Sequence, residues 1–171
     1  MKGEKEANVQ PKLELQEVVP YLNLPSSKGT DVNLWDFKQR KNLVLIFHHG
    51  RACPHCRKKL KELAGVYKEI QALEAEILAV SFDNFEDAKK QGEEDGLPFP
   101  LLLDQSRATT ERFTFIDKSR SLPFPTVFIT DKFGALRYQK IAEEAIELPN
   151  AIEILRWLIF IESECPECSH L

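Results

Sequence analysis

The fold of this chain follows from residues 43–56, whose sequence is LVLIFHHGRACPHC. The first five residues are an unbroken apolar run of strand length, which is typical of a central strand covered on both faces. From Cys53 onward, apolar residues recur at helical spacing (positions 56, 60, 63, 67 and 70), with lysine and glutamate between them. A buried strand is therefore expected to lead directly into a helix that begins with Cys-x-x-Cys.

The flanking sequence repeats this alternation of apolar runs and amphipathic stretches. Strands are predicted at residues 18–24, 77–82, 99–103, 125–129 and 135–141. Helices are predicted at 84–94, with Asp83 as its cap, at 106–113, and from Pro149 to about Glu162. The turn at 25–29 closes an opening β-hairpin with Val32 and Leu34. The pattern predicts an α/β fold with a central mixed sheet flanked by helices and an N-terminal β-hairpin extension.

Size and composition favour one ordinary globular domain. The chain has 171 residues, 43% of them hydrophobic and 29% charged, which suits a domain over residues 15–162, a polar lead at 1–14 and a short tail at 163–171. The net charge of −4 is dispersed with no basic stripe, so no nucleic-acid partner is expected. No apolar stretch suits a signal peptide or a membrane span, so we expect no membrane association and, if Met1 is the start, a cytoplasmic protein.

The four cysteines form two pairs of identical spacing, CPHC at 53–56 and CPEC at 165–168. Cytoplasmic thiols are mostly kept reduced, so catalysis or metal binding is favoured over structural disulfides. A helix N-terminus stabilises a thiolate, which makes Cys53 the expected nucleophile. Cys56 faces the core one turn later and is placed to attack a mixed disulfide. His55 could stabilise the thiolate when protonated, and Pro54 suits the first helical turn. The alternatives for this pair are a structural zinc knuckle or two incidental thiols.

Several segments together resemble the redoxin group of the thioredoxin superfamily, over roughly residues 15–162. They are residues 19–24, 28–29, 34–37, 53–56, 99–104 and 125–134. This group includes the peroxiredoxins of the alkyl hydroperoxide reductase type and the TlpA-like thiol-disulfide oxidoreductases. The resemblance implies a thioredoxin-like fold and a thiol-disulfide oxidoreductase without a cofactor. It also implies protein dithiol or disulfide partners, such as a thioredoxin-like reductant or a client protein, and a monomer or homodimer.

The chain departs from the peroxiredoxin pattern in ways that place peroxidase activity second. Peroxiredoxins carry Pro and Thr or Ser before the reactive cysteine and an Arg on a later strand, whereas this chain has HHGRA at 48–52 and Pro125 in the place of that Arg. We therefore expect slow peroxide turnover, with Arg51 and Arg120 as candidate replacements. The third alternative is a zinc-binding or redox-sensing module. Thioredoxins also carry an acidic proton acceptor on the preceding strand, and here His48 or His49 could substitute for it.

Pro125 resembles the proline that thioredoxin-like proteins hold in a cis peptide facing the active disulfide. The resemblance implies a cis bond between Phe124 and Pro125, against the sulfur of Cys53, with Pro123 as the competing candidate. It also places Thr126, along with Pro54 of the motif, among the residues that contact substrate.

The second pair, Cys165 and Cys168, follows the last helix near the end of the chain. Three interpretations are open: a redox relay to the first pair, a zinc site together with His170, or exposed thiols without a role. Apart from zinc at this pair, no cofactor is expected. The last helix is apolar nearly all round from Ile154 to Ile161, and we expect it to be buried within the domain, with a dimer contact as the alternative.

Overall fold

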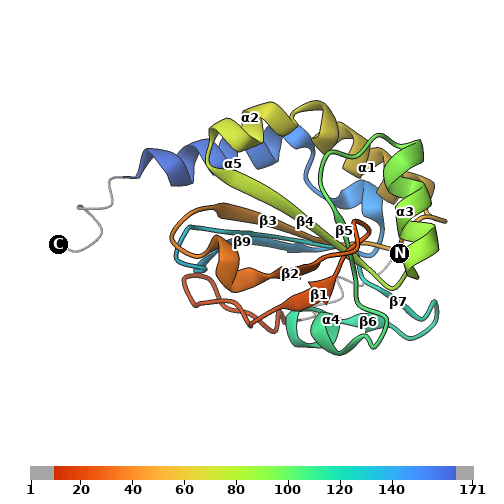
Figure 1. Cartoon of the computed structure of the whole chain (residues 1–171). Helices are drawn as coiled ribbons and strands as arrows, with labels where there is room; N and C mark the ends of the chain where they lie inside the picture. Colours follow the sequence, from red (N-terminus) through yellow and green to blue (C-terminus); the bar gives the residue numbers. More distant parts are fainter. Residues whose placement is uncertain (1–9, 165–171) are drawn as a thin grey trace, which may run out of the picture.

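A five-stranded mixed sheet forms the centre of the computed structural model, which describes residues 10–164 (Figure 1). Its strands lie in the order β5-β4-β3-β8-β9. Strand β3 (Asn42–Phe47) pairs in parallel with β4 (Ala75–Ser81), which pairs in parallel with β5 (Leu101–Leu103). On its other side β3 pairs antiparallel with β8 (Thr126–Thr130), which continues to β9 (Leu136–Ile141). The predicted mixed sheet is therefore confirmed.

The helices lie close to the predicted ranges, except that the single helical stripe expected from Cys53 to Ile70 is divided at Val66 into two helices. They are α1 (Pro54–Gly65), α2 (Tyr67–Ala72), α3 (Phe85–Glu94), α4 (Ala108–Phe113) and α5 (Ala151–Ser163), with 3₁₀ turns η1 (Leu34–Phe37) and η2 (Ala145–Glu147). The opening hairpin is β1 (Asn23–Pro25) with β2 (Asp31–Asn33). One hairpin, β6 (Ile116–Asp117) with β7 (Leu122–Pro123), was not predicted, because two-residue strands leave no periodicity in the sequence.

Strand β3 is buried along its whole length because both faces of the sheet are covered. Val44 and Ile46 pack with α1, α2 and α5, which lie together over one face in Figure 1. Leu43, Leu45 and Phe47 point to the opposite face and pack with residues of the opening hairpin, α4 and β8. Successive strand residues point to opposite faces, so an unbroken apolar run is what a doubly covered strand requires.

Two expectations about helices are wrong. Helix α3 is capped by Asn84, whose side chain accepts a hydrogen bond from the Asp87 N–H, and not by Asp83. Helix α5 buries Ile154, Leu158 and Ile161, but its opposite face leaves Ile152, Ile159 and Phe160 exposed to solvent. One sheet face can accept only one side of a helix, so the second apolar side of α5 stays uncovered within this domain.

Among residues 10–164, none of the helices has the length and apolar character needed to cross a membrane.

Candidate functional site: a dithiol at the start of α1

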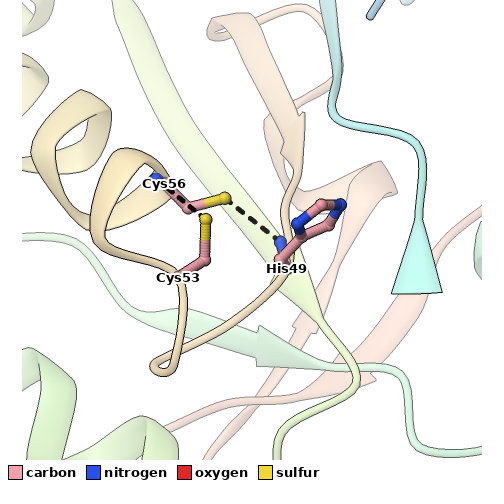
Figure 2. A group of neighbouring side chains, drawn as sticks. All are labelled: His49, Cys53 and Cys56. Atoms are coloured by element: carbon pink, nitrogen blue, oxygen red, sulfur yellow. Dashed lines mark hydrogen bonds between the residues drawn. The ribbon is translucent and has the colours of Figure 1, made fainter. Parts of the chain in front are cut away.

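Cys53 ends the loop that connects β3 to α1, and Cys56 lies in the first turn of α1. Cys53 is the N-cap of α1 and Pro54 follows at the first helical position, where its missing N–H leaves no hydrogen bond unmade. The Cys53 Sγ accepts a hydrogen bond from the Cys56 backbone N–H at 3.2 Å (Figure 2). The sulfur of Cys53 thus takes the position at which a capping oxygen usually satisfies the first turn, and it faces the positive end of the helix.

The two thiols differ in access to solvent. Cys53 is half-buried, whereas Cys56 is only 2% exposed and packs beneath the first turn of α1. Burial, followed by its hydrogen bond with Cys53, raises the pKa of the Cys56 thiol above its ordinary value. Cys56 therefore stays protonated until a reaction draws its proton away, which fits a thiol that acts second.

Of the two histidines before the motif, His49 is the one beside the sulfurs. Its backbone N–H donates to Cys56 Sγ at 3.4 Å, and one of its imidazole nitrogens and both sulfurs lie within 4.8 Å of one another (Figure 2). Burial and the charge of Arg120 lower the pKa of His49, so its imidazole is neutral near pH 7 and able to accept a proton.

His48 is unsuited to proton transfer. It is 1% exposed, and its Nδ1 already accepts a hydrogen bond from the Gly50 N–H at 3.1 Å. Burial, with a smaller contribution from His49, lowers the pKa of His48 to about 3, so the ring is neutral at physiological pH. The sequence left His48 and His49 as equal candidates, and the structure places only His49 against the sulfurs.

The two candidate arginines, Arg51 and Arg120, have different partners in the structure. The Arg51 guanidinium turns toward α3, where it pairs with Glu94 at 2.7 Å and Asp87 at 3.6 Å. Arg120, in the unpredicted β6–β7 hairpin, is bound by Glu144 of the loop before η2. Its hydrogen bond to Glu144 raises the pKa of Arg120 above the ordinary value of an arginine.

Gly50 lies three residues before Cys53, and the space beside it is filled by Asp83. Gly50 has φ +95°, a conformation that side chains rarely adopt, and a Cβ there would lie 2.5 Å from Asp83 Oδ1. The Asp83 Oδ2 accepts a hydrogen bond from the Arg51 N–H at 2.7 Å, and burial raises the pKa of this carboxyl. Asp83, which the sequence suggested only as a helix cap, thus supports the loop that delivers Cys53.

The expected cis bond before Pro125 is wrong, because all peptide bonds among residues 10–164 are trans. The preceding segment is held extended: Phe124 N–H donates to the Phe115 carbonyl, and β7 pairs with β6 immediately before it. Thr126 is fully buried, and its hydroxyl is bonded to the Thr114 hydroxyl at 2.9 Å and to the Phe124 carbonyl at 2.8 Å. A side chain with these internal bonds does not offer its hydroxyl to a substrate.

The remaining candidates lie at or beyond the edge of the site. Pro54 and His55 are both exposed on the first turn of α1, and His55 lies outside the cluster formed by His49 and the two sulfurs. Contact of Pro54 with substrate stays a prediction. Cys165 and Cys168, with the proposed relay or zinc site, fall outside the described residues.

The difference in exposure predicts the order of alkylation. With a limiting amount of iodoacetamide under native, reduced conditions, Cys53 is expected to be modified well before Cys56, because Cys56 is buried and protonated. Peptide mass mapping resolves these two sites from Cys165 and Cys168. Modification of Cys56 ahead of Cys53 would reverse the assigned roles.

The chain is similar to known proteins in both sequence and fold. The sequence model of the AhpC/TSA family matches residues 15–139, most of the chain. The chain belongs to the AhpC/TSA family. The resemblance to the redoxin group is thereby confirmed, and with it the thioredoxin-like fold. The β3–α1 loop described above lies within the matched residues.

Relatives of this AhpC/TSA protein share about a third of the aligned residues. Peroxiredoxin bcp1 of Schizosaccharomyces pombe is 30% identical over 103 residues, which are 60% of this chain and 53% of that protein. Peroxiredoxin Bcp of Bacillus subtilis is 32% identical over 101 residues, 59% of this chain and 64% of that protein. The crystal structure of peroxidoxin BcpB from Mycobacterium tuberculosis superposes with a TM-score of 0.77 at 22% identity, covering 87% of this chain and 98% of that one. The matches thus span between half and two thirds of these curated relatives, and the solved structure supports the fold.

Proposed function

We propose that this chain is a thiol peroxidase in which Cys53 is oxidised by a peroxide and Cys56 resolves the product. The observation that carries the proposal is the arrangement of the two sulfurs. Cys53 Sγ lies half-exposed at the helix start and accepts the Cys56 N–H, while the Cys56 sulfur lies buried within 4.8 Å of it. Cys53 is accessible to the oxidant, and Cys56 lies beneath it, close enough to form the disulfide.

The proposed oxidation of the dithiol takes place in two steps. The Cys53 thiolate attacks one peroxide oxygen, the O–O bond breaks, and the departing alkoxide or hydroxide takes up a proton, leaving Cys53 as a sulfenic acid. The Cys56 thiol then attacks the Cys53 sulfur, an S–S bond forms, and the sulfenic oxygen leaves as water. An external dithiol, such as a thioredoxin-like protein, returns the disulfide to two thiols and is itself oxidised. His49 is the neutral base beside the sulfurs for the Cys56 proton.

The relatives favour this function over the thiol-disulfide exchange that the motif alone placed first, since they are named peroxiredoxins. The site nevertheless predicts slow peroxide turnover. Gly50 supplies no hydroxyl, and the adjoining space holds the Asp83 carboxylate, whose charge does not stabilise a departing oxyanion. Loss of one such donor costs about 10²–10³-fold in rate, so we expect kcat/KM for hydrogen peroxide at least about 100-fold below that of Bacillus subtilis peroxiredoxin Bcp.

A single-turnover experiment tests the proposal. The reduced full chain carrying Cys165→Ser and Cys168→Ser has only the first cysteine pair, so one equivalent of hydrogen peroxide is expected to consume two thiols. Mass spectrometry is expected to find the Cys53–Cys56 disulfide. Loss of one thiol per peroxide, or no thiol loss, would argue against it. Steady-state peroxide consumption with dithiothreitol then gives the rate for comparison with the relative.

Thiol-disulfide exchange is the second candidate, favoured by the same two sulfurs and by the absence of a side chain at Gly50. The Cys53 thiolate would attack a disulfide of a partner protein, and Cys56 would release the reduced partner while forming the intramolecular disulfide. Insulin reduction by dithiothreitol separates the candidates. Strong acceleration of insulin precipitation with negligible peroxide consumption would assign the site to protein disulfides.

A further inference from the structure

The neighbouring groups at the start of α1 offer two sulfurs and one imidazole nitrogen, which is a ligand set that zinc binds. The three atoms come from Cys53, Cys56 and His49 and lie within 4.8 Å of one another. A tetrahedral zinc ion holds sulfur at about 2.3 Å and nitrogen at about 2.0–2.1 Å, which separates adjacent ligands by roughly 3.5–3.8 Å. Side-chain rotations that move each of these atoms by about an ångström therefore bring all three to coordination distance.

We propose that the reduced site binds one zinc ion through Cys53, Cys56 and His49, and that the bound ion blocks the reaction of Cys53. On binding, the two thiols release two protons to solvent and form two S–Zn bonds, so the zinc with its two thiolates is uncharged overall. Oxidation of the pair removes both sulfur ligands. Zinc binding and the disulfide therefore exclude one another.

The surroundings supply the support that a zinc site requires. The thiolates keep backbone donors, because Cys56 N–H points at the Cys53 sulfur and His49 N–H points at the Cys56 sulfur. The positive charge of Arg120, which would oppose the binding of a cation, is paired with Glu144.

The site also has room for entry and for a fourth ligand. His49 and Cys53 are half-exposed while Cys56 lies underneath, so the ion would approach from the solvent side of the loop. A three-ligand zinc with one open position resembles catalytic zinc sites, and here solvent would occupy that position. The open coordination makes the ion removable, as a reversible inhibitor must be.

Metal titration of the reduced, full-length chain tests the binding. The Cys165→Ser, Cys168→Ser background removes the second cysteine pair as a competing site. We expect one zinc per chain in competition with a chromophoric chelator, and a sulfur-to-metal charge-transfer band when cadmium replaces zinc. His49→Ala is expected to weaken zinc binding about 100-fold or more, whereas His55→Ala, a matched histidine outside the cluster, is expected to leave it unchanged.

Two results would overturn the zinc site: no zinc retained by the reduced protein, or equal affinity in the His49→Ala and parent chains. The blocking of Cys53 rests on the proposed function, whereas the binding does not. Protection of Cys53 from iodoacetamide by zinc, reversed by chelation, measures the block without any turnover. Zinc bound with no peroxide consumed by the apo protein would refute the peroxidase, and peroxide consumed without zinc binding would refute this inference.

Discussion

Replacing Cys53 by serine is expected to lower peroxide consumption by at least about 10³-fold, to the rate of peroxide and dithiothreitol alone. The reaction begins with attack by the Cys53 thiolate, and a serine hydroxyl at the same helix start is neither ionised nor comparably nucleophilic. The substitution is nearly isosteric, and serine also caps helices well, so the fold and the hydrogen bond from Cys56 N–H are expected to persist. Peroxide loss followed spectrophotometrically gives the measurement.

Cys56→Ser is the matched variant and is expected to behave differently. Attack on the first equivalent of peroxide remains, but the Cys53 sulfenic acid has no thiol beneath it and accumulates. Trapping with dimedone and mass spectrometry is expected to find one labelled Cys53 per chain. Sustained peroxide consumption by Cys53→Ser, with full loss in Cys56→Ser, would assign the nucleophile to the buried thiol.

The second large effect is expected at Gly50. Gly50→Ala is expected to lower the free energy of unfolding by about 2–4 kcal/mol, because it adds a side chain at positive φ and forces it against the Asp83 carboxylate. Asp83 can withdraw only by giving up the hydrogen bond from the Arg51 N–H. Urea denaturation of the reduced protein measures the change.

Three further variants distinguish the cost of a positive φ from the cost of the contact between an added Cβ and Asp83. Gly29 also has a positive φ but nothing within 4 Å of an added Cβ, so Gly29→Ala is expected to cost only about 1–2 kcal/mol. Gly92 lies inside α3 with open space around it, and Gly92→Ala is expected to stabilise by about 0.5–1 kcal/mol. In an Asp83→Ala background, Gly50→Ala is expected to cost less than in the parent chain. Equal costs in both backgrounds would show that Asp83 does not restrict residue 50.

The fold could be predicted from sequence because its signals are local. The apolar run of β3, the helical spacing after Cys53 and the turn residues between later elements all act within a few neighbours along the chain. The difference in exposure between the two thiols also follows from local geometry. The first residue of Cys-x-x-Cys caps the helix, and the second faces the core one turn later. The exposure of the second apolar side of α5 was not predicted, because the burial of a helix face depends on whether another element covers it.

By itself, the sequence determined an α/β domain and a dithiol in which Cys53 precedes a buried Cys56, because periodicity and helix capping are properties of consecutive residues. Its resemblance to the redoxin group added the thioredoxin-like topology. Only the tertiary structure decided which side chains surround that dithiol. His49 rather than His48 lies beside the sulfurs, Arg51 pairs with Glu94 of α3, and Arg120 pairs with Glu144. The two arginine pairings join residues that lie tens of positions apart along the chain, and no local pattern in the sequence records which way such side chains turn.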